Sequence, residues 1–531
     1  MGRVNRAREK SILASETRYG LNQSVRVDSG EAHVDFILTI DVGTSSLKAA
    51  LFDAAMTIVA QSKQEYITNY PKIGWAEQNP DDWTRALIWA VHDILDRTRL
   101  PPDAIAGIGI DGMSSLMLPV DSQGKPLCPG LIWLDRRAQE QSDFINRQHG
   151  ALHLSISGNR SDPSNFGPKA MWLRDCRRNV YDASAVLLHC SSYLVHQLTG
   201  VFVMNRSEAG LSQLCDIRTG AYSDELIEVS GLDRGKLPEI AGCSEVVGRV
   251  TPAAAVTFGL AAGTPVIAGA MDNVAATTGL GLRNDGDAYV AAGTATNVGV
   301  LVDAPPVDGH GLVYHSGIDG KWLVNGSVDY GSAGLLWFRN LLGERDFDKL
   351  CAAAAETGFA SHPLIFLPYM TGQRAPLWND ALSGVMIGIT PGTDRRHLAR
   401  MFMESTALGA RHAFRKLRTE RPSAAALTGG ITNNLLWTEI FADATGMRLI
   451  PSGQTEVGNL GLAILAGIGI GSFRSIDDAF ALLPRGELRE PNPARSKYYD
   501  DLFSIFDIAY ESNLHALAQL NQIRENYEVE K

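Results

Sequence analysis

The stretch DFILTIDVGTSSLKAALFD, residues 35–53, contains two short apolar runs separated by the turn sequence GTSS. This arrangement predicts a strand, a tight turn and a second strand. The same pattern recurs later, where DAYVAAG (287–293) and NVGVLVD (297–303) flank the turn TAT. The chain therefore carries one strand-turn-strand unit in each half.

Helical patterns alternate with the strand patterns. The segment NPDDW (79–83) combines a capping side chain, a proline in the first turn and acidic residues, so a helix is expected to follow it. Further strands are expected at 104–111 and 425–430, and a helix at 434–446. Strands that alternate with helices predict an α/β protein.

The C-terminal region has the pattern of a long helix. Residues 496–525 carry Leu502, Ile505, Ile508 and Leu514 at loosely helical spacing. We expect these residues to pack on the second domain, so that the helix caps it.

The length of 531 residues is too great for one ordinary core and predicts two large domains. We expect domains at 35–283 and 284–480, preceded by an extension at 1–34 and followed by a helical tail at 481–531. The extension is expected to be disordered or to reflect a start codon placed too far upstream. It lacks the apolar segment of a secretory signal.

Charge and composition weigh against several classes of partner. The formal net charge of -11 disfavours a nucleic acid or an anionic membrane. No apolar run reaches the roughly 18 to 20 residues that a membrane span needs. The six cysteines form no C-x-x-C pair, which is typical of reduced thiols in a cytoplasmic protein. We therefore expect a cytoplasmic protein without a nucleic-acid or membrane partner.

The first turn is a candidate phosphate site. Gly43 lets the chain turn closely, so that backbone N–H groups and the hydroxyls of Thr44 and Ser45 converge. Asp41, at the end of the preceding strand, would lie beside a phosphate and could hold magnesium. An ordinary hairpin with a Gly-Thr turn is the alternative interpretation.

Two further glycine turns match this one. Gly293 and Thr294 occupy the corresponding place in the second half, so the two turns could bind one polyphosphate from opposite sides of a cleft. The pair Gly429-Gly430 precedes a predicted helix and could lie against an adenine ring or phosphates. Taken alone, the pair is a common strand-helix turn.

Asp272 is the one acid in the stretch GAMDNVAATTGLG (269–281). It could cap the helix that follows, which is the common role of an isolated aspartate. It could instead act as a general base that accepts the proton of an attacking hydroxyl. The two roles are compatible.

Other conspicuous side chains have structural interpretations. Asp135, Arg136 and Arg137 are expected to form an ion-pair network, with substrate contact as the alternative. Four tryptophans are interpreted as core and interdomain packing rather than as sugar platforms: Trp133, Trp172, Trp322 and Trp337. The histidines show no metal-ligand spacing.

Taken together, these motifs resemble the FGGY carbohydrate kinases, and the xylulose kinases among them. The resemblance spans about residues 35–475 in matching order. It rests on DVGTSSLKAALFD, GWAEQNPDDW, GLIWLDRRA, SNFGPKAMWL, YLVHQLTG, GAMDN, FLPYMTGQRAPLW and LTGGITNNLLWTEIFADATG.

This resemblance implies two ribonuclease-H-like domains of the actin and hexokinase type around a cleft for ATP and sugar. It implies ATP and Mg²⁺ as cofactors and Asp272 as the catalytic base. The other residues implied are Asp41 for the metal; Gly43, Thr44, Ser45, Gly293, Thr294, Gly429, Gly430 and Asn434 for ATP; and Met113, Ser114, Ser115, Asp272 and Asn273 for the substrate.

The resemblance indicates the identity of the substrate less directly. Xylulose and gluconate kinases commonly have a histidine near Ser114 and Ser115, whereas the segments around Asn165 and Tyr193 look like those of xylulose kinases. A ketopentose such as xylulose is the first choice, with ribulose, a tetritol, glycerol, another ketose or a sugar acid such as gluconate left open. A homodimer is one option for the assembly. A non-catalytic nucleotide or sugar sensor and an actin-like assembly protein are the competing classes.

Overall fold

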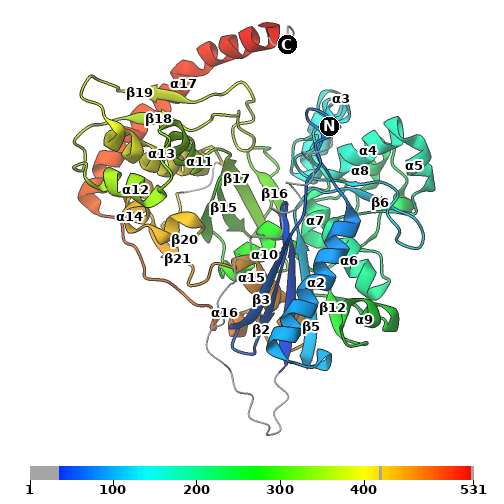
Figure 1. The fold of residues 1–531 in the computed structure, drawn as a ribbon. Coiled ribbons are helices and arrows are strands. Elements are labelled where there is room, and N and C mark those ends of the chain that lie inside the picture. The colour runs from blue at the N-terminus through cyan, green and yellow to red at the C-terminus, as the bar shows by residue number, and fades with distance from the viewer. Residues whose placement is uncertain (1–34, 418–420, 528–531) are drawn as a thin grey trace, which may run out of the picture.

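The computed structural model describes residues 35–417 and 421–527. The predicted extension at 1–34 lies outside the described residues. Two twisted sheets, one from each half of the chain, form the framework, with helices against their faces (Figure 1).

The first sheet is built from the N-terminal half. Strand β1 (Phe36–Val42) pairs antiparallel with β2 (Ser46–Phe52), and parallel with β5 (Ile105–Gly112) on its other side. The remaining strands are β3 (Ile58–Glu65) beside β2, β12 (Pro265–Ile267) and β13 (Ala270–Met271) beside β5, and β11 (Val246–Arg249) at the edge.

The second sheet repeats this order. Strand β14 (Ala288–Ala292) pairs antiparallel with β15 (Thr296–Val302) and parallel with β20 (Ala424–Thr428). The remaining strands are β17 (Trp322–Val328) beside β15, β16 (Leu312–His315) at that edge, and β21 (Arg448–Pro451) beside β20. The predicted α/β class and the repeated strand-turn-strand unit are confirmed.

Short strand pairs connect the outer segments. They are β4 (Glu77–Gln78) with β7 (Gly130–Leu131), β6 (Leu118–Val120) with β8 (Val186–Leu188), β9 (Val203–Asn205) with β10 (Glu239–Ala241), and β18 (Ile365–Leu367) with β19 (Val385–Ile387).

Helix α2 (Pro80–Thr98) covers one face of the first sheet and packs on β2 and β3. Its predicted start is confirmed, because the Asn79 side chain accepts the N–H of Asp81. The other helices of this half are α3 (Gln139–Ser157), α4 (Phe166–Cys176), α5 (Arg178–Ala183), α6 (Cys190–Thr199), α7 (Arg206–Leu211), α8 (Asp224–Ser230), α9 (Pro252–Phe258) and α10 (Asp272–Gly279).

Helix α13 (Arg395–Lys416) packs on β15 and β17 of the second sheet. The helix predicted after Gly429-Gly430 is α14 (Leu435–Thr445). The other helices of this half are α11 (Ala333–Leu341), α12 (Phe347–Ala355), α15 (Val457–Gly469), α16 (Ile476–Phe480) and α17 (Pro493–Tyr527). No helix in the described ranges is both long and apolar enough to cross a membrane.

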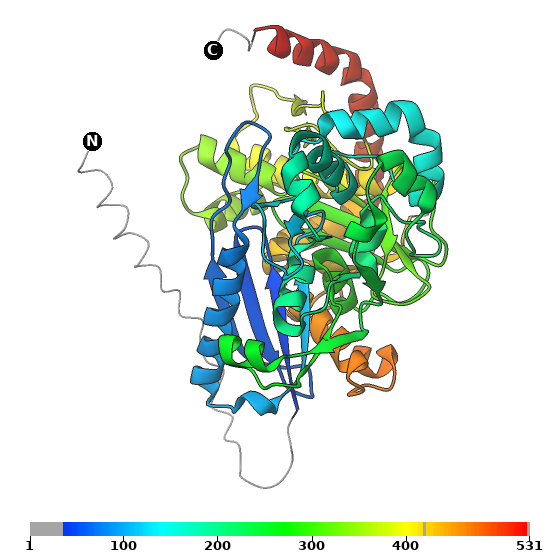
Figure 2. The same ribbon diagram turned by 90° about the vertical axis from the view of Figure 1, so that its right-hand side faces the viewer.

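The tail helix exists, but its predicted packing face is partly wrong. In α17, Leu502 is buried, whereas Ile505 is 49% exposed and Ile508 is 60% exposed. The buried face is instead set by aromatic side chains, including Tyr499, Phe506 and Tyr510, which join the core of the second half. The end of α17 extends away from the body of the protein (Figure 2).

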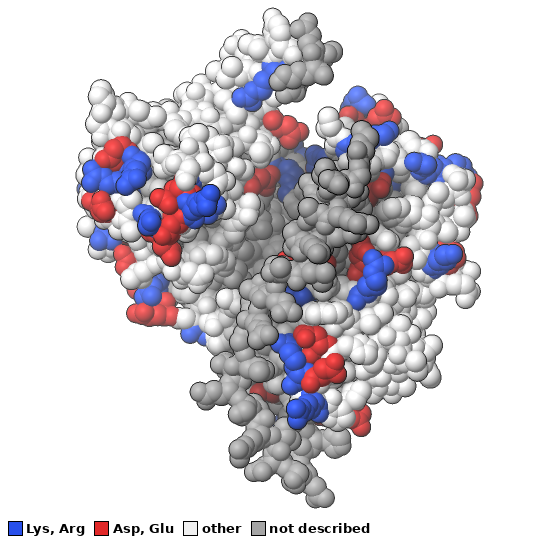
Figure 3. Space-filling model, viewed as in Figure 1, with Lys and Arg blue, Asp and Glu red and all other residues white. Residues whose placement is uncertain are grey.

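Positive and negative side chains are mixed on the face of the protein shown in Figure 3. Lys and Arg side chains are interspersed there with Asp and Glu.

Helices α10 and α15 cross between the two sheets and share one hydrophobic core with both. Their crossing is unusually close at two glycines. A Cβ atom on Gly461 would lie 1.8 Å from the Ala275 carbonyl oxygen, and one on Gly279 would lie 2.0 Å from the Val457 carbonyl oxygen. Only glycine fits here, because the obstructing atoms belong to backbone.

Gly461→Ala is therefore expected to lower the thermal midpoint and the soluble yield. Overpacking of this kind typically costs about 1–3 kcal/mol, and the backbone contact places this site at the upper end. Differential scanning fluorimetry measures the shift. Gly150→Ala is the matched control, because a Cβ on Gly150 in α3 meets nothing within 4 Å. An unchanged midpoint for Gly461→Ala would show that the helices separate at little cost.

Candidate active site

The first turn, between β1 and β2, is closed by the N–H of Gly43, which donates to the Ser46 carbonyl at 3.0 Å. A Cβ on Gly43 would lie 3.1 Å from that same oxygen, which explains the small residue. The Thr44 hydroxyl accepts the indole N–H of Trp133 at 2.9 Å, and Ser45 is exposed. The turn is thus fixed on one side and open on the other.

The second turn, between β14 and β15, exposes Gly293 and Thr294. It meets Gly429 and Gly430 in a cavity of about 910 Å³. Gly429 has φ of 97°, and a Cβ there would lie 2.3 Å from the Ala292 carbonyl oxygen. Gly430 faces open space, so a flat or anionic group can approach the backbone closely.

Asn434 has a different position from the glycines. Its side chain caps α14 by accepting the N–H of Trp437 at 2.9 Å, while Thr432 and Asn433 line the cavity. The first turn, from Asp41 to Ser45, does not appear among the described residues that line it. The structure therefore brings the second turn and the glycine pair together in one cavity, whereas the first turn is not part of its described wall.

A smaller cavity of about 370 Å³ adjoins the first, and both include Ala291 and Asn297 in their walls. Its lining is strongly polar, with two tryptophans. The side chains concerned are Ser114, Ser115, Trp133, Asp162, Ser164, Asn165, Asp272, Asn273, Asn297, Tyr314, Asn325, Arg374 and Trp378. We call this cavity the polar pocket and the larger one the glycine pocket.

Asp272 faces the polar pocket from the first residue of α10. Met271 occupies the N-cap position, and the Asp272 carboxylate accepts only the N–H of Asn273, at 2.7 Å, among the described groups. The alternative of a capping residue is therefore wrong. Although the residue is open to the pocket, the surrounding protein removes water from the carboxylate and raises the pKa of Asp272 to about 7.

Asn273 is held by residues of the second sheet. Its amide donates to the Tyr289 hydroxyl at 2.8 Å and to the Tyr314 hydroxyl, and it approaches Asn325 at 3.4 Å. Tyr289 in turn donates to Asn325. This network links the start of α10 to β14, β16 and β17 across the cleft.

The loop after β5 forms another wall of the polar pocket. Ser115 has φ of 59° and donates its hydroxyl to Asn165 at 2.9 Å, while Ser114 is half-buried and lines the pocket. Lys169 fixes this loop, because its buried ammonium donates to the Ser115 carbonyl at 2.7 Å and the Ile132 carbonyl at 2.6 Å. Met113 is buried in the core instead of lining the pocket.

Asp111 is a site residue that the sequence interpretation missed. It lies opposite Asp41 in the parallel pairing of β1 and β5, is 1% exposed, and has no hydrogen-bond partner at either oxygen among the described residues. Burial and the neighbouring Asp41 and Asp272 carboxylates hold the pKa of Asp111 well above its usual range. Burial also raises the pKa of Asp41. Such orphaned oxygens are suited to a cation.

The carboxylates of Asp41 and Asp111 fit Mg²⁺, which shares its ligands with a nucleotide, better than a metal ion that protein side chains alone would bind. Among the described residues, no set of three or more His, Cys, Asp or Glu side chains is arranged to hold a metal ion. Mg²⁺ is usually held by one or two carboxylates together with phosphate oxygens and water. Asp41 and Asp111 could supply the two carboxylates.

Two structural interpretations from the sequence can now be judged. The ion-pair network is confirmed, because Arg137 pairs with Asp135 and with Glu77, both at 2.7 Å, and Arg136 pairs with Asp162 at 2.9 Å. Trp133 packs against the core of the first half, as expected, and it also lines the polar pocket. Its indole N–H is bonded to Thr44, so its ring is presented to the cavity from a fixed position.

Comparison with known proteins agrees with this geometry. Residues 36–279 match the N-terminal domain and residues 288–470 the C-terminal domain of the FGGY family of carbohydrate kinases. The chain is 29% identical to a glycerol kinase of Thermococcus gammatolerans, with 86% of this chain and 93% of that protein covered. It is 26% identical to a xylulose kinase of Lactococcus lactis, with 92% and 99% covered.

The fold is shared with solved structures. The gluconate kinase of Lactobacillus acidophilus superposes with a TM-score of 0.86 at 22% identity, with 92% of this chain and 100% of that chain covered. The two matched domains lead to one conclusion. The chain belongs to the FGGY family of carbohydrate kinases and is an ATP-dependent sugar kinase.

Proposed function

We propose that the protein transfers the γ-phosphoryl group of ATP to a terminal hydroxyl of a ketopentose such as xylulose, with Asp272 as the catalytic base. The observation that carries this proposal is the position of Asp272. Its carboxylate faces the polar pocket, which adjoins the glycine pocket at Ala291 and Asn297. A sugar hydroxyl and a nucleotide phosphate could therefore meet beside this base.

In the proposed reaction the sugar hydroxyl oxygen attacks the γ-phosphorus as its proton passes to the Asp272 carboxylate. The bond between the γ-phosphorus and the oxygen bridging it to the β-phosphate breaks, and ADP leaves. A pKa of about 7 suits this role, because about half of the base is then ionised at neutral pH and it still accepts a proton readily. The rest of the site positions the reactants.

The composition of the polar pocket supports a polyhydroxylated substrate. Amide and hydroxyl groups, including those of Asn165, Asn297 and Asn325, can donate and accept hydrogen bonds with sugar hydroxyls. Trp133 and Trp378 offer flat apolar surfaces for the carbon skeleton. The similarity to xylulose kinases over nearly the whole chain supports a ketopentose as the first choice.

A sugar acid such as gluconate is the second candidate, and Arg374 is the observation that favours it. Its guanidinium lies in the wall of the polar pocket, 5.4 Å from the centre of the Trp133 ring. Its ion pair with Asp329 is long, at 3.5 Å. A substrate carboxylate could bind this guanidinium through two parallel hydrogen bonds.

We further propose that Asp41 and Asp111 hold Mg²⁺ with the nucleotide. When bound, such an ion would neutralise the charge of the transferred phosphoryl group. The supporting observation is the pair of Asp111 oxygens, which are buried and lack any donor among the described groups.

Asp272→Asn is expected to lower kcat by about 10²–10⁴-fold, because the amide keeps the shape of the side chain but cannot accept the proton. The Kd for ATP, measured by isothermal titration, should change little. In the wild type, kcat/KM should fall about tenfold per pH unit below pH 7, since the base is then protonated. This acid limb should be absent from the residual activity of the variant.

Asp103→Asn is the control, because Asp103 is exposed and lies before the start of β5. It should keep the wild-type rate and pH profile. A kcat near the wild-type value for Asp272→Asn would exclude the proposed base.

The substrate assignment predicts a ranking. In a coupled assay of ADP release, xylulose should give the highest kcat/KM among ketopentoses, tetritols, hexuloses, glycerol and gluconate. If gluconate ranks first, the Arg374 alternative is correct, and Arg374→Met should then raise the KM for gluconate much more than that for neutral sugars.

Asp111→Asn is expected to weaken divalent-cation binding roughly tenfold or more, by analogy with losses from groups that support a metal site. Mn²⁺ binding in the presence of a non-hydrolysable ATP analogue, followed by electron paramagnetic resonance, measures this directly. Without metal the variant should be at least as thermally stable as the wild type, because an unpaired buried carboxylate has been removed. Unchanged Mn²⁺ binding would show that Asp111 has no metal role.

A further inference from the structure

A third large cavity lies at the opposite end of the second sheet from the glycine pocket. It encloses about 650 Å³ and includes the first residues of β14 and β20, Ala288 and Ala424. The last residues of these strands lead to Gly293 and Gly429 in the glycine pocket. Small side chains at Ala424–Ala426 leave the space open. We call this cavity the hinge pocket.

The hinge pocket is formed where the chain passes between its two halves. Residues 280–287, which connect α10 to β14, form one wall. The loop that follows α16 forms another, and Leu483 packs against this connector near Gly281. Among the described residues, the hinge pocket shares only Pro451 and Ser452 with the glycine pocket, so it is a separate site.

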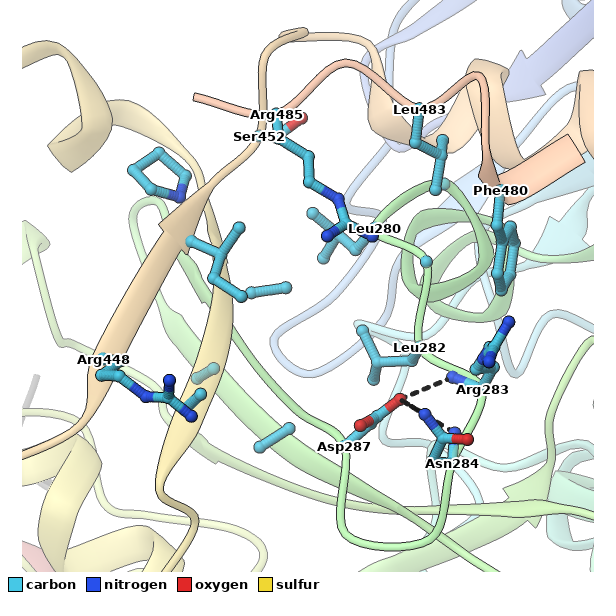
Figure 4. A pocket seen from close by; sticks show the side chains of 18 of the residues that line it. Leu280, Leu282, Arg283, Asn284, Asp287, Arg448, Ser452, Phe480, Leu483 and Arg485 are labelled. Atoms are coloured by element: carbon cyan, nitrogen blue, oxygen red, sulfur yellow. Dashed lines mark hydrogen bonds between the residues drawn. The ribbon is translucent and has the colours of Figure 1, made fainter. Parts of the chain in front are cut away.

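Three arginines from three segments reach this cavity, as Figure 4 shows. Arg283 is already paired with Asp477. Asp287 already has hydrogen-bond partners, because its carboxylate accepts the backbone N–H groups of Arg283 at 2.9 Å and Asn284 at 2.8 Å.

Arg448 and Arg485 are different from Arg283. Among the described residues, neither has an ion-pair partner, although the chain carries a net charge of -11. Both side chains extend into the hinge pocket in Figure 4. Two guanidinium groups are therefore available to an anion.

The backbone that carries these two arginines is fixed. Arg448 begins β21, and its N–H donates to the Ser423 carbonyl at 3.0 Å. Arg485 lies between two backbone hydrogen bonds, from Gly453 to the Pro484 carbonyl at 3.1 Å and from Gly486 to the Pro451 carbonyl at 2.8 Å. The points from which both side chains extend are therefore fixed before a ligand binds.

Other parts of the cavity are apolar. Leu280, Leu282, Phe480 and Leu483 line them (Figure 4). A ligand that fills the cavity thus needs an anionic end for the arginines and a carbon body for these apolar parts. Phosphate monoesters meet both needs, because a guanidinium can bind two phosphate oxygens at once.

We propose that the hinge pocket binds a small phosphate monoester, which contacts Arg448 and Arg485 through its phosphate and the leucine and phenylalanine side chains through its carbon body. This site is independent of the substrate assignment. A ligand here would touch the connector and the segments beside β21 at the same time, so it would bridge the parts of the chain that join the two halves.

Isothermal titration with phenyl phosphate tests the proposal, in the presence of a saturating non-hydrolysable ATP analogue that fills the nucleotide site. Saturable binding to one site is expected, with inorganic phosphate weaker and phenol without binding. Arg448→Met and Arg485→Met should each weaken phenyl phosphate by about tenfold or more, the loss expected for a charge-assisted hydrogen bond.

Arg474→Met is the matched control, since Arg474 is exposed and does not line the hinge pocket among the described residues. It should bind phenyl phosphate like the wild type, and all three variants should keep the basal kinase activity. Absence of binding at millimolar phenyl phosphate, or wild-type binding by both pocket variants, would overturn the proposal. Equal affinity for phenol or for inorganic phosphate would also overturn it, because one of the two required features would then be unnecessary.

Discussion

The contact of α10 with α15 at Gly279 and Gly461 is the constraint on which the two halves of this kinase depend. The helices touch backbone to backbone, so no side chain separates them. Helix α10 begins at Asp272, while α15 packs on β1 and β5, whose ends carry Asp41 and Asp111. One close crossing therefore sets the position of the base relative to the acids of the first sheet.

Local sequence patterns predicted the repeated part of the fold well. Each turn, at Gly43 and at Gly293, follows a short apolar strand and needs no knowledge of distant residues. The face of α17 was harder, because Ile505 and Ile508 share the helical spacing of core residues but are exposed. Packing there is decided by Tyr499 and its aromatic neighbours, which meet a surface formed by distant segments of the chain.

The residues of the candidate site also fall into those that local sequence could identify and those that it could not. Asp272 was identifiable because a single acid in a small-residue stretch is locally unusual. Tyr314, Asn325 and Trp378 carry no such signal, since three separate segments bring them to the polar pocket. Asp111 could be recognised only from the register of β5 against β1, which places it opposite Asp41. Topology, rather than residue type, makes these residues part of one site.

Electrostatics gives the strongest reason to expect a cation in this cleft. Burial raises the pKa values of all three acids, Asp41, Asp111 and Asp272; Asp41 and Asp272 further raise that of Asp111, Asp41 further raises that of Asp272, and ATP adds more negative charge. Among the described side chains, the polar pocket has one basic group, Arg374, which already pairs with Asp329. The glycine pocket also has one, Arg489, which pairs with Glu487. Lys48 also lowers the pKa values of Asp41 and Asp111, but these basic groups are few beside the three carboxylates and the charge of a triphosphate. A divalent ion between Asp41 and Asp111 would correct that imbalance and leave Asp272 free to accept a proton.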